Sequence, residues 1–160
     1  MALTDPQYDQ LAAYIAADPV LGLLPHNSDS AVKVKDALNL PASPAFWVWR
    51  TVQAYEYKAS GGIVWTEVDA LTVGKARIFE WLTGNLTMPI NAADANVRGG
   101  ITDAFAAGTT TRTQLTALGR EQATIAEKLF ATGTGTTASP ATRTHQRPLS
   151  AWDVEQAWAV

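Results

Sequence analysis

The chain contains no cysteine and only two histidines among its 160 residues. Without cysteine, disulfide frameworks and thiolate metal sites are excluded, and the composition is typical of a protein that folds in a reducing cytoplasm. The histidines, His26 and His145, lie far apart, and neither has a second imidazole or a carboxylate at the spacing of a metal site. We expect both to be solvent-exposed loop residues, with no bound metal and no cofactor.

Charge and long hydrophobic runs are also scarce. Charged residues make up 17% of the chain, and 12 basic against 15 acidic side chains give a formal charge of −3. Nucleic-acid binding as a main role normally needs a basic face, which this composition disfavours. No apolar run approaches 18 residues and no basic-plus-apolar leader opens the chain. We therefore expect neither a membrane span nor a secretory signal.

What the chain does have is a globular share of apolar residues and many tryptophans. An apolar fraction of 47% over 160 residues can bury a core in one domain. Six tryptophans is a high number for this length. Tryptophan is enriched at protein interfaces, so surplus copies indicate contact with a partner. The alternative is that all six are core aromatics of a helical domain.

Apolar periodicity and capping residues predict an all-α body of about five helices. Thr4, Asp5 and Pro6 mark the first start, and Asp94 marks a later one. A short β-hairpin over 55–64 is the alternative that we consider, since Ile63 to Trp65 could be extended. The expected helical ranges, of which the second is the weakest, are about 5–17, 30–38, 44–59, 66–83, 94–105 and 114–131.

The stretch 131–148, ATGTGTTASPATRTHQRP, has no large apolar side chain. Such a segment cannot bury enough apolar surface to offset the cost of ordering its backbone. Fully extended, it spans roughly 60 Å. We therefore expect two parts, a helical body over 1–131 and an extended C-terminal arm over 132–160. The arm docks either on a neighbouring subunit or on the protein's own body.

The end of this arm carries the signals of a short helix. Ser150 and Asp153 form a capping-box pair, and Leu149 and Val154 are placed for a hydrophobic staple. A helix of about nine residues is unstable alone in water, so its tryptophans must pack on something. A disordered tail is the alternative. The expected partner interface consists of Arg143, Arg147, Leu149, Trp152, Val154 and Trp158.

No catalytic constellation is visible, and we expect a protein that is not an enzyme. Glu121 and Glu127 flank the apolar stripe of the last long helix and are expected to be solvated. Gly133-Thr134-Gly135 is similar to a glycine-rich phosphate loop, but no lysine follows it and no helix begins after it. Nothing is similar to a nucleophile elbow or a paired-carboxylate site. An enzyme with a site built from scattered residues stays open as an alternative.

Two stretches resemble small virion proteins of tailed bacteriophages, in particular the helical head-to-tail connectors, or adaptors, beneath the portal. They are WTEVDALTVGKARIFEWLTG at 65–84 and EKLFATGTGTTASPATRTHQRPLSAWDVEQAW at 127–158. The resemblance implies a homo-oligomeric ring, commonly of twelve copies, around a channel through which DNA passes. It implies partners in the portal and a tail or nozzle protein, and a place in the neck of the virion after assembly in the host cytoplasm. The C-terminal arm would pack on the portal or on an adjacent adaptor.

Other functions remain open from the residues alone. A small helical regulator or DNA-binding protein could use a helix-turn-helix pair over 66–105, although few Arg and Lys lie there. Another neck or tail-completion role fits the same resemblance. If the arm only docks on a partner, removing the residues after Ala131 leaves a folded body and abolishes assembly.

Overall fold

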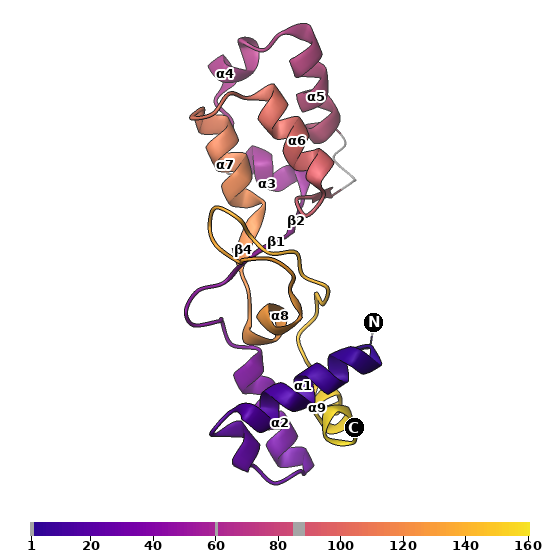
Figure 1. Ribbon diagram of the computed structural model, residues 1–160. Coiled ribbons are helices and arrows are strands. Elements are labelled where there is room, and N and C mark those ends of the chain that lie inside the picture. Colours follow the sequence, from indigo (N-terminus) through magenta and orange to yellow (C-terminus); the bar gives the residue numbers. More distant parts are fainter. Residues whose placement is uncertain (1, 60, 85–88) are drawn as a thin grey trace. The chain divides into compact units, whose positions relative to one another are not determined.

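The computed structural model of the chain describes residues 2–59, 61–84 and 89–160 (Figure 1). This part of the chain is rich in helix, as predicted, but four short strands correct the expectation of a wholly α-helical body. The strands are β1 (Trp47–Trp49), β2 (Thr51–Val52), β3 (Ile90–Asn91) and β4 (Arg120–Gln122). The helices are α1 (Asp5–Ala17), the 3-10 turn η1 (Leu21–Leu23), α2 (Ser28–Leu38), α3 (Ala54–Ala59), α4 (Trp65–Asp69), α5 (Val73–Thr83), α6 (Ala95–Ala104), α7 (Thr110–Leu118), α8 (Ile125–Phe130) and α9 (Ala151–Trp158).

The expected helix over 44–59 is wrong for its first half. Here β1 pairs with β4, and β2 pairs antiparallel with β3, with Thr51 opposite Asn91 and Val52 opposite Ile90. The segment is dense in aromatic and β-branched residues, which favour strands. Val48 and Val52 are fully buried, whereas Trp47 and Trp49 on either side of Val48 are partly exposed. Placed on a helix, the apolar residues of this segment would cover several faces. They do so because buried and exposed residues alternate with a period closer to two, as in a strand.

Two other expected helices are interrupted. The helix over 66–83 is split into α4 and α5, and Thr72 is the residue before the second start. The last long helix is split at Gly119 into α7 and, after β4, α8. A Cβ at Gly119 would lie 2.9 Å from the Cβ of Ala92, so the chain packs too closely there for a side chain. Of the hairpin considered over 55–64, residue 60 lies outside the described residues, and α3 occupies the part before it.

The chain forms two compact units, which are described separately. Unit 1 comprises Met1–Val48 and Gln122–Val160, and unit 2 comprises Trp49–Glu121. This division differs from the expected boundary at 131/132. The 132–160 segment belongs to the same compact unit as α1 and α2. Within the described residues, no helix combines the length and the apolar character needed to cross a membrane.

The core of unit 1 is formed by α1, α2, α8 and α9 (Figure 1). Each of α1, α8 and α9 begins with a capping box, at Thr4, Thr124 and Ser150 respectively. In this motif a side chain bonds a backbone N–H three residues on, and that residue bonds back, so two otherwise unpaired donors are satisfied. The side chains that fill the core are Leu3, Tyr8, Leu11, Ile15, Ala31, Val34, Leu38, Ala126, Phe130, Leu149, Val154 and Ala157.

Backbone contacts help to order the loop between α8 and α9, which has few large apolar side chains. Thr132 and Thr142 exchange two N–H to carbonyl hydrogen bonds, and the Ala141 N–H donates to the carbonyl of Trp47. Gly135 has φ +65°, and a Cβ there would lie 2.0 Å from the ring of Phe46. A glycine is therefore needed at 135 for close approach to an aromatic ring, and no role in binding phosphate is required to explain it.

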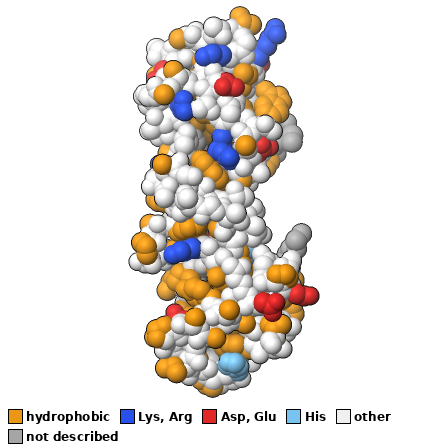
Figure 2. Space-filling view, in the orientation of Figure 1, with side chains coloured by type: hydrophobic (Ala, Val, Ile, Leu, Met, Phe, Trp, Pro, Cys, Tyr) orange, Lys and Arg blue, Asp and Glu red, His pale blue; other side chains and the backbone are white. Residues whose placement is uncertain are grey.

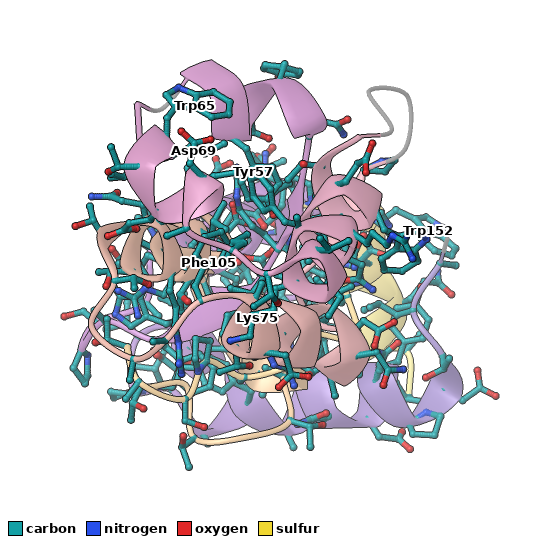
Figure 3. All side chains as sticks on the ribbon, turned by 90° about the horizontal axis from the view of Figure 1, so that it is seen from above. Tyr57, Trp65, Asp69, Lys75, Phe105 and Trp152 are labelled. Atoms are coloured by element: carbon teal, nitrogen blue, oxygen red, sulfur yellow. The ribbon has the colours of Figure 1, made fainter. Side chains whose placement is uncertain are left out.

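Unit 2 has its own core, built from α3 and α5–α7 around Phe79 and Phe105, whose rings meet edge to face at 5.4 Å. Figure 3 shows Tyr57 and Phe105 in the interior of the helices. Glu67 of α4 joins this unit by capping α7. Its two carboxylate oxygens accept hydrogen bonds from the backbone N–H groups of Thr110 (2.9 Å) and Thr111 (2.8 Å). A carboxylate at a helix N-terminus is stabilising because it pairs with the free N–H groups and with the helix dipole.

Candidate partner-binding surfaces

Two residues of the expected interface lie in the core of unit 1. Leu149 is 2% exposed and Val154 is fully buried, and both pack in the cluster that α1 and α2 share. Asn39, the residue after α2, holds both backbone groups of Leu149: its side-chain amide donates to the Leu149 carbonyl and accepts from the Leu149 N–H, each at 2.9 Å. The sequence left two docking sites open for the arm, a neighbouring subunit and the protein's own body. In the structure the segment packs on the body of its own chain.

Arg147, another predicted interface residue, is bound to the fully buried carboxylate of Asp153. Its guanidinium donates to both carboxylate oxygens, at 2.8 and 2.6 Å. Ser150 adds donations from its N–H and hydroxyl, and the hydroxyl of Tyr8 lies at 3.4 Å. Burial by itself raises the pKa of Asp153, but the hydrogen bonds from Arg147 and Ser150 outweigh it and bring that pKa down to about 2. The network thus holds a charged group inside unit 1.

Arg143 is likewise engaged within unit 1. Its guanidinium donates to a carboxylate oxygen of Glu127 at 2.7 Å, and both side chains are nearly buried. The same Glu127 closes the capping box of α8 by accepting from the Thr124 N–H. Glu127 was expected to be solvated, and the structure corrects this: it ties the 131–148 loop to the start of α8.

The two C-terminal tryptophans have different surroundings. Trp152 is 52% exposed, and its ring meets that of Tyr8 edge to face at a centroid distance of 6.2 Å. Trp158 is partly buried and stacks flat on His26, with centroids 4.6 Å apart. Of the six residues expected at the interface, Trp152 is therefore the one that presents a large aromatic surface to solvent (Figure 3).

Unit 2 exposes aromatic residues that the sequence pattern did not single out. Trp65, at the start of α4, is 67% exposed, and Trp81 of α5 is 76% exposed. Asp69 lies four residues after Trp65, on the same face of α4, and Figure 3 shows the two together at one edge. On α5, Arg77 lies four residues before Trp81 and therefore shares its helical face. Trp81 lies outside the apolar stripe of α5 that contains Ile78 and Leu82. This position is the sequence signal from which its exposure could have been predicted.

Unit 1 also carries an apolar hollow of about 300 Å³. Its lining comes from α1, α8 and the residues after α2, and consists of Tyr14, Ala42, Ser43, Ile125, Lys128 and Leu129. Lys128 is its one cation, and its ammonium lies 5.8 Å from the centroid of the Phe46 ring. Figure 2 shows side chains by type over the surface, with apolar groups gathered on unit 1 as well as on unit 2. An apolar hollow with one positive charge suits an aromatic side chain that is accompanied by a carboxylate.

A larger groove of about 680 Å³ lies at the start of α1, between Thr4 and Gln7 on one side and 144–147 on the other. His145 lines it but is itself 6% exposed, which corrects the expectation of a solvent-exposed histidine. Its ring meets the ring of Phe130 edge to face, with the two centroids 5.5 Å apart. Burial lowers the pKa of His145 below its usual value, and the nearby charge of Arg147 adds to this. The groove combines the hydroxyl groups of Thr4 and Thr144 with the side-chain amides of Gln7 and Gln146.

Among the described residues, no three His, Asp or Glu side chains are grouped so that they could hold a metal ion. Comparison of the chain with models of protein families, with curated proteins and with solved structures finds no match.

Proposed function

We propose that this protein is a structural virion protein, a head-to-tail adaptor that forms a ring under the portal of a tailed bacteriophage and joins it to the tail. The observation that carries the proposal is the position of the exposed tryptophans. Trp65, Trp81 and Trp152 are each more than half exposed, and all three fall in the stretches 65–84 and 127–158 that resemble such adaptors. Exposed tryptophans are typical anchors of protein interfaces.

The proposed mode of docking follows the structure of unit 1. The short helix α9 is held rigidly by the core and by the Arg147–Asp153 pair, so Trp152 projects from a fixed helix rather than from a free arm. A rigid anchor loses little conformational freedom on binding. Burying a tryptophan removes about 150–250 Å² of surface from water, and a ring multiplies such a contact over its copies. We infer that the portal binds the α9 face that carries Trp152.

Charge favours the adaptor over the DNA-binding alternative. Unit 2 carries seven acidic and seven basic side chains, and unit 1 carries eight acidic and five basic ones. The region proposed for a helix-turn-helix pair, 66–105, lies in unit 2 and has no excess of positive charge. A reader of duplex DNA needs several Lys or Arg contacts to phosphate. A neutral to acidic surface suits a channel through which DNA slides.

The test is the solution mass of the full-length protein, alone and mixed with a portal protein from the same phage. We expect a large complex in the mixture, and Trp152→Ala should weaken the capture by about tenfold or more. Tyr55→Ala is the matched control, because Tyr55 is an exposed aromatic outside both stretches. A wild-type protein that ignores the portal overturns the proposal, and so does equal loss with both variants. Salt-sensitive binding to duplex DNA would favour the regulator instead.

A further inference from the structure

Unit 1 has a mostly apolar hollow lined by one cation, and unit 2 has an exposed tryptophan beside a carboxylate, which are chemically complementary to it. The hollow is about 300 Å³ in volume, its lining is mostly apolar, and Lys128 is the one cation that lines it. The exposed tryptophan is Trp65, and the carboxylate of Asp69 lies on the same face of α4 (Figure 3). No ion pair joins Lys128 or Asp69 to another side chain among the described residues. Both charges are thus available to a second molecule.

We propose that Trp65 of one copy inserts into this hollow on unit 1 of a second copy, with Asp69 paired to Lys128. The indole would lie against Tyr14, Ile125 and Leu129, and the ammonium of Lys128 could rest on its face as it already does near Phe46. A cation on an aromatic face and a close ion pair both strengthen when water is excluded.

Charge is what selects Trp65 over the other exposed tryptophan of unit 2. The neighbour of Trp81 on its helical face is Arg77, a cation, which would be repelled by Lys128. The neighbour of Trp65 is a carboxylate, which is attracted. Like charges brought together at an interface reject the wrong partner, while opposite charges fix the register.

The two surfaces are different, so the contact is heterologous. A heterologous contact repeats from copy to copy and closes into a ring or grows into a filament, rather than stopping at a two-fold dimer. The inference therefore deepens the proposed ring and rests on the proposed function for its biological setting. The contact itself needs no portal and can be measured with this chain alone.

The experiment measures self-association of the full-length protein by sedimentation equilibrium over a wide range of concentration. Trp65→Ala should weaken association by about tenfold or more. Tyr55→Ala is the matched control and should leave it unchanged, because it removes a similarly exposed aromatic side chain from the same unit. Thermal unfolding of both variants checks that the fold is kept, which is expected since neither side chain is buried.

A charge reversal gives an independent readout. Lys128→Glu alone should weaken association several-fold, and adding Asp69→Lys should restore it, since the pair is reformed with opposite signs. A wild-type chain that stays monomeric at its highest soluble concentration overturns the contact, as does a double variant no better than Lys128→Glu. A chain that captures the portal but fails these tests keeps its proposed function and loses this contact. A chain that associates through Trp65 but ignores the portal does the reverse.

Discussion

The guanidinium of Arg147 and the carboxylate of Asp153 form a two-pronged ion pair in which the acid is fully buried. The two residues lie on opposite sides of the start of α9, so the pair fastens the 131–148 loop to the helix that follows it. The Tyr8 hydroxyl connects the same carboxylate to α1. The segment expected to be an extended arm is in this way locked into unit 1.

Removing one member of this pair should be costly. We expect Arg147→Ala to lower the free energy of unfolding by about 3 kcal/mol, because it leaves a buried carboxylate without its partner. Asp153→Asn should cost less in the Arg147→Ala background than in the wild type, since it then removes an unpaired charge. Denaturant unfolding of the four proteins in this cycle measures the difference. Equal costs in both backgrounds would show that the two side chains do not interact energetically.

Stability should also depend on acid in a way that traces to Asp153. Its pKa is about 2 in the folded protein against an ordinary value of 3.8, so the folded state favours the charged form. This contribution is fully present above about pH 4 and is lost as the pH falls through 2. Thermal unfolding of wild type and Asp153→Asn between pH 5 and pH 2 should therefore converge toward low pH. Parallel curves over that range contradict the assignment.

Ionisation of Tyr57 should lower the stability of unit 2 at alkaline pH. Burial raises its pKa to about 12 from an ordinary value of 10, because the phenolate is disfavoured in the core. The contribution of the neutral phenol to stability is complete below pH 10 and is lost as the pH rises toward 12. Ultraviolet absorbance should show late ionisation of Tyr57 and also of Tyr8, whose pKa is raised by burial as well, and loss of structure should accompany ionisation of Tyr57. In Tyr57→Phe the late phase should become smaller, and an unchanged late phase would assign it to Tyr8.

Three of the expected helix starts were predictable from local sequence. Thr4, Asp94 and Ser150 each precede a helix as expected, because a cap depends only on side chains within three residues. The strand β1 was not predicted, since its partner β4 lies some seventy residues further along the chain. The residue types of β1 favour a strand, but the pairing that forms it is not visible in local periodicity.

The candidate surfaces were only partly predictable for a similar reason. Periodicity can place Leu149 and Val154 on an apolar face, but it does not say whether the face belongs to this chain or to a partner. The 131–148 loop has no periodic signal because its order comes from backbone hydrogen bonds, such as those between Thr132 and Thr142, and from the ion pair of Arg143 with Glu127. The helix that carries Trp65 is held by Glu67, which caps α7 through residues more than forty positions away in the sequence, and local periodicity cannot show such a contact.

The glycine at 135 gives a test of how the loop packs. Gly135→Ala should destabilise unit 1 through a clash with the Phe46 ring and through its positive φ. Gly108→Ala is a matched control, because Gly108 also has a positive φ but has open space around it. We expect the first variant to lose about 2 kcal/mol more than the second in denaturant unfolding. Phe46→Ala in the Gly135→Ala background should recover part of that excess.

The decisive variant for the role of 132–160 is a chain that ends at Ala131. It lacks Leu149, Val154 and Ala157, three buried members of the unit 1 core, and burial of a Leu or Val side chain contributes about 1.5–3 kcal/mol. It also removes Arg147 and Asp153 together. The structure therefore predicts that unit 1 unfolds, with loss of far-ultraviolet circular dichroism and exposure of apolar surface to a hydrophobic dye.

Deletion of 159–160 alone is the control for this truncation, because both residues are exposed and lie after α9. It should keep the unfolding transition of the full chain. If the chain ending at Ala131 instead stays folded and only fails to assemble, 132–160 acts as a docking arm and its packing on α1 and α2 is dispensable. Because unfolding abolishes assembly by itself, the point variant Trp152→Ala, and not truncation, is the change that separates binding of a partner from folding of unit 1.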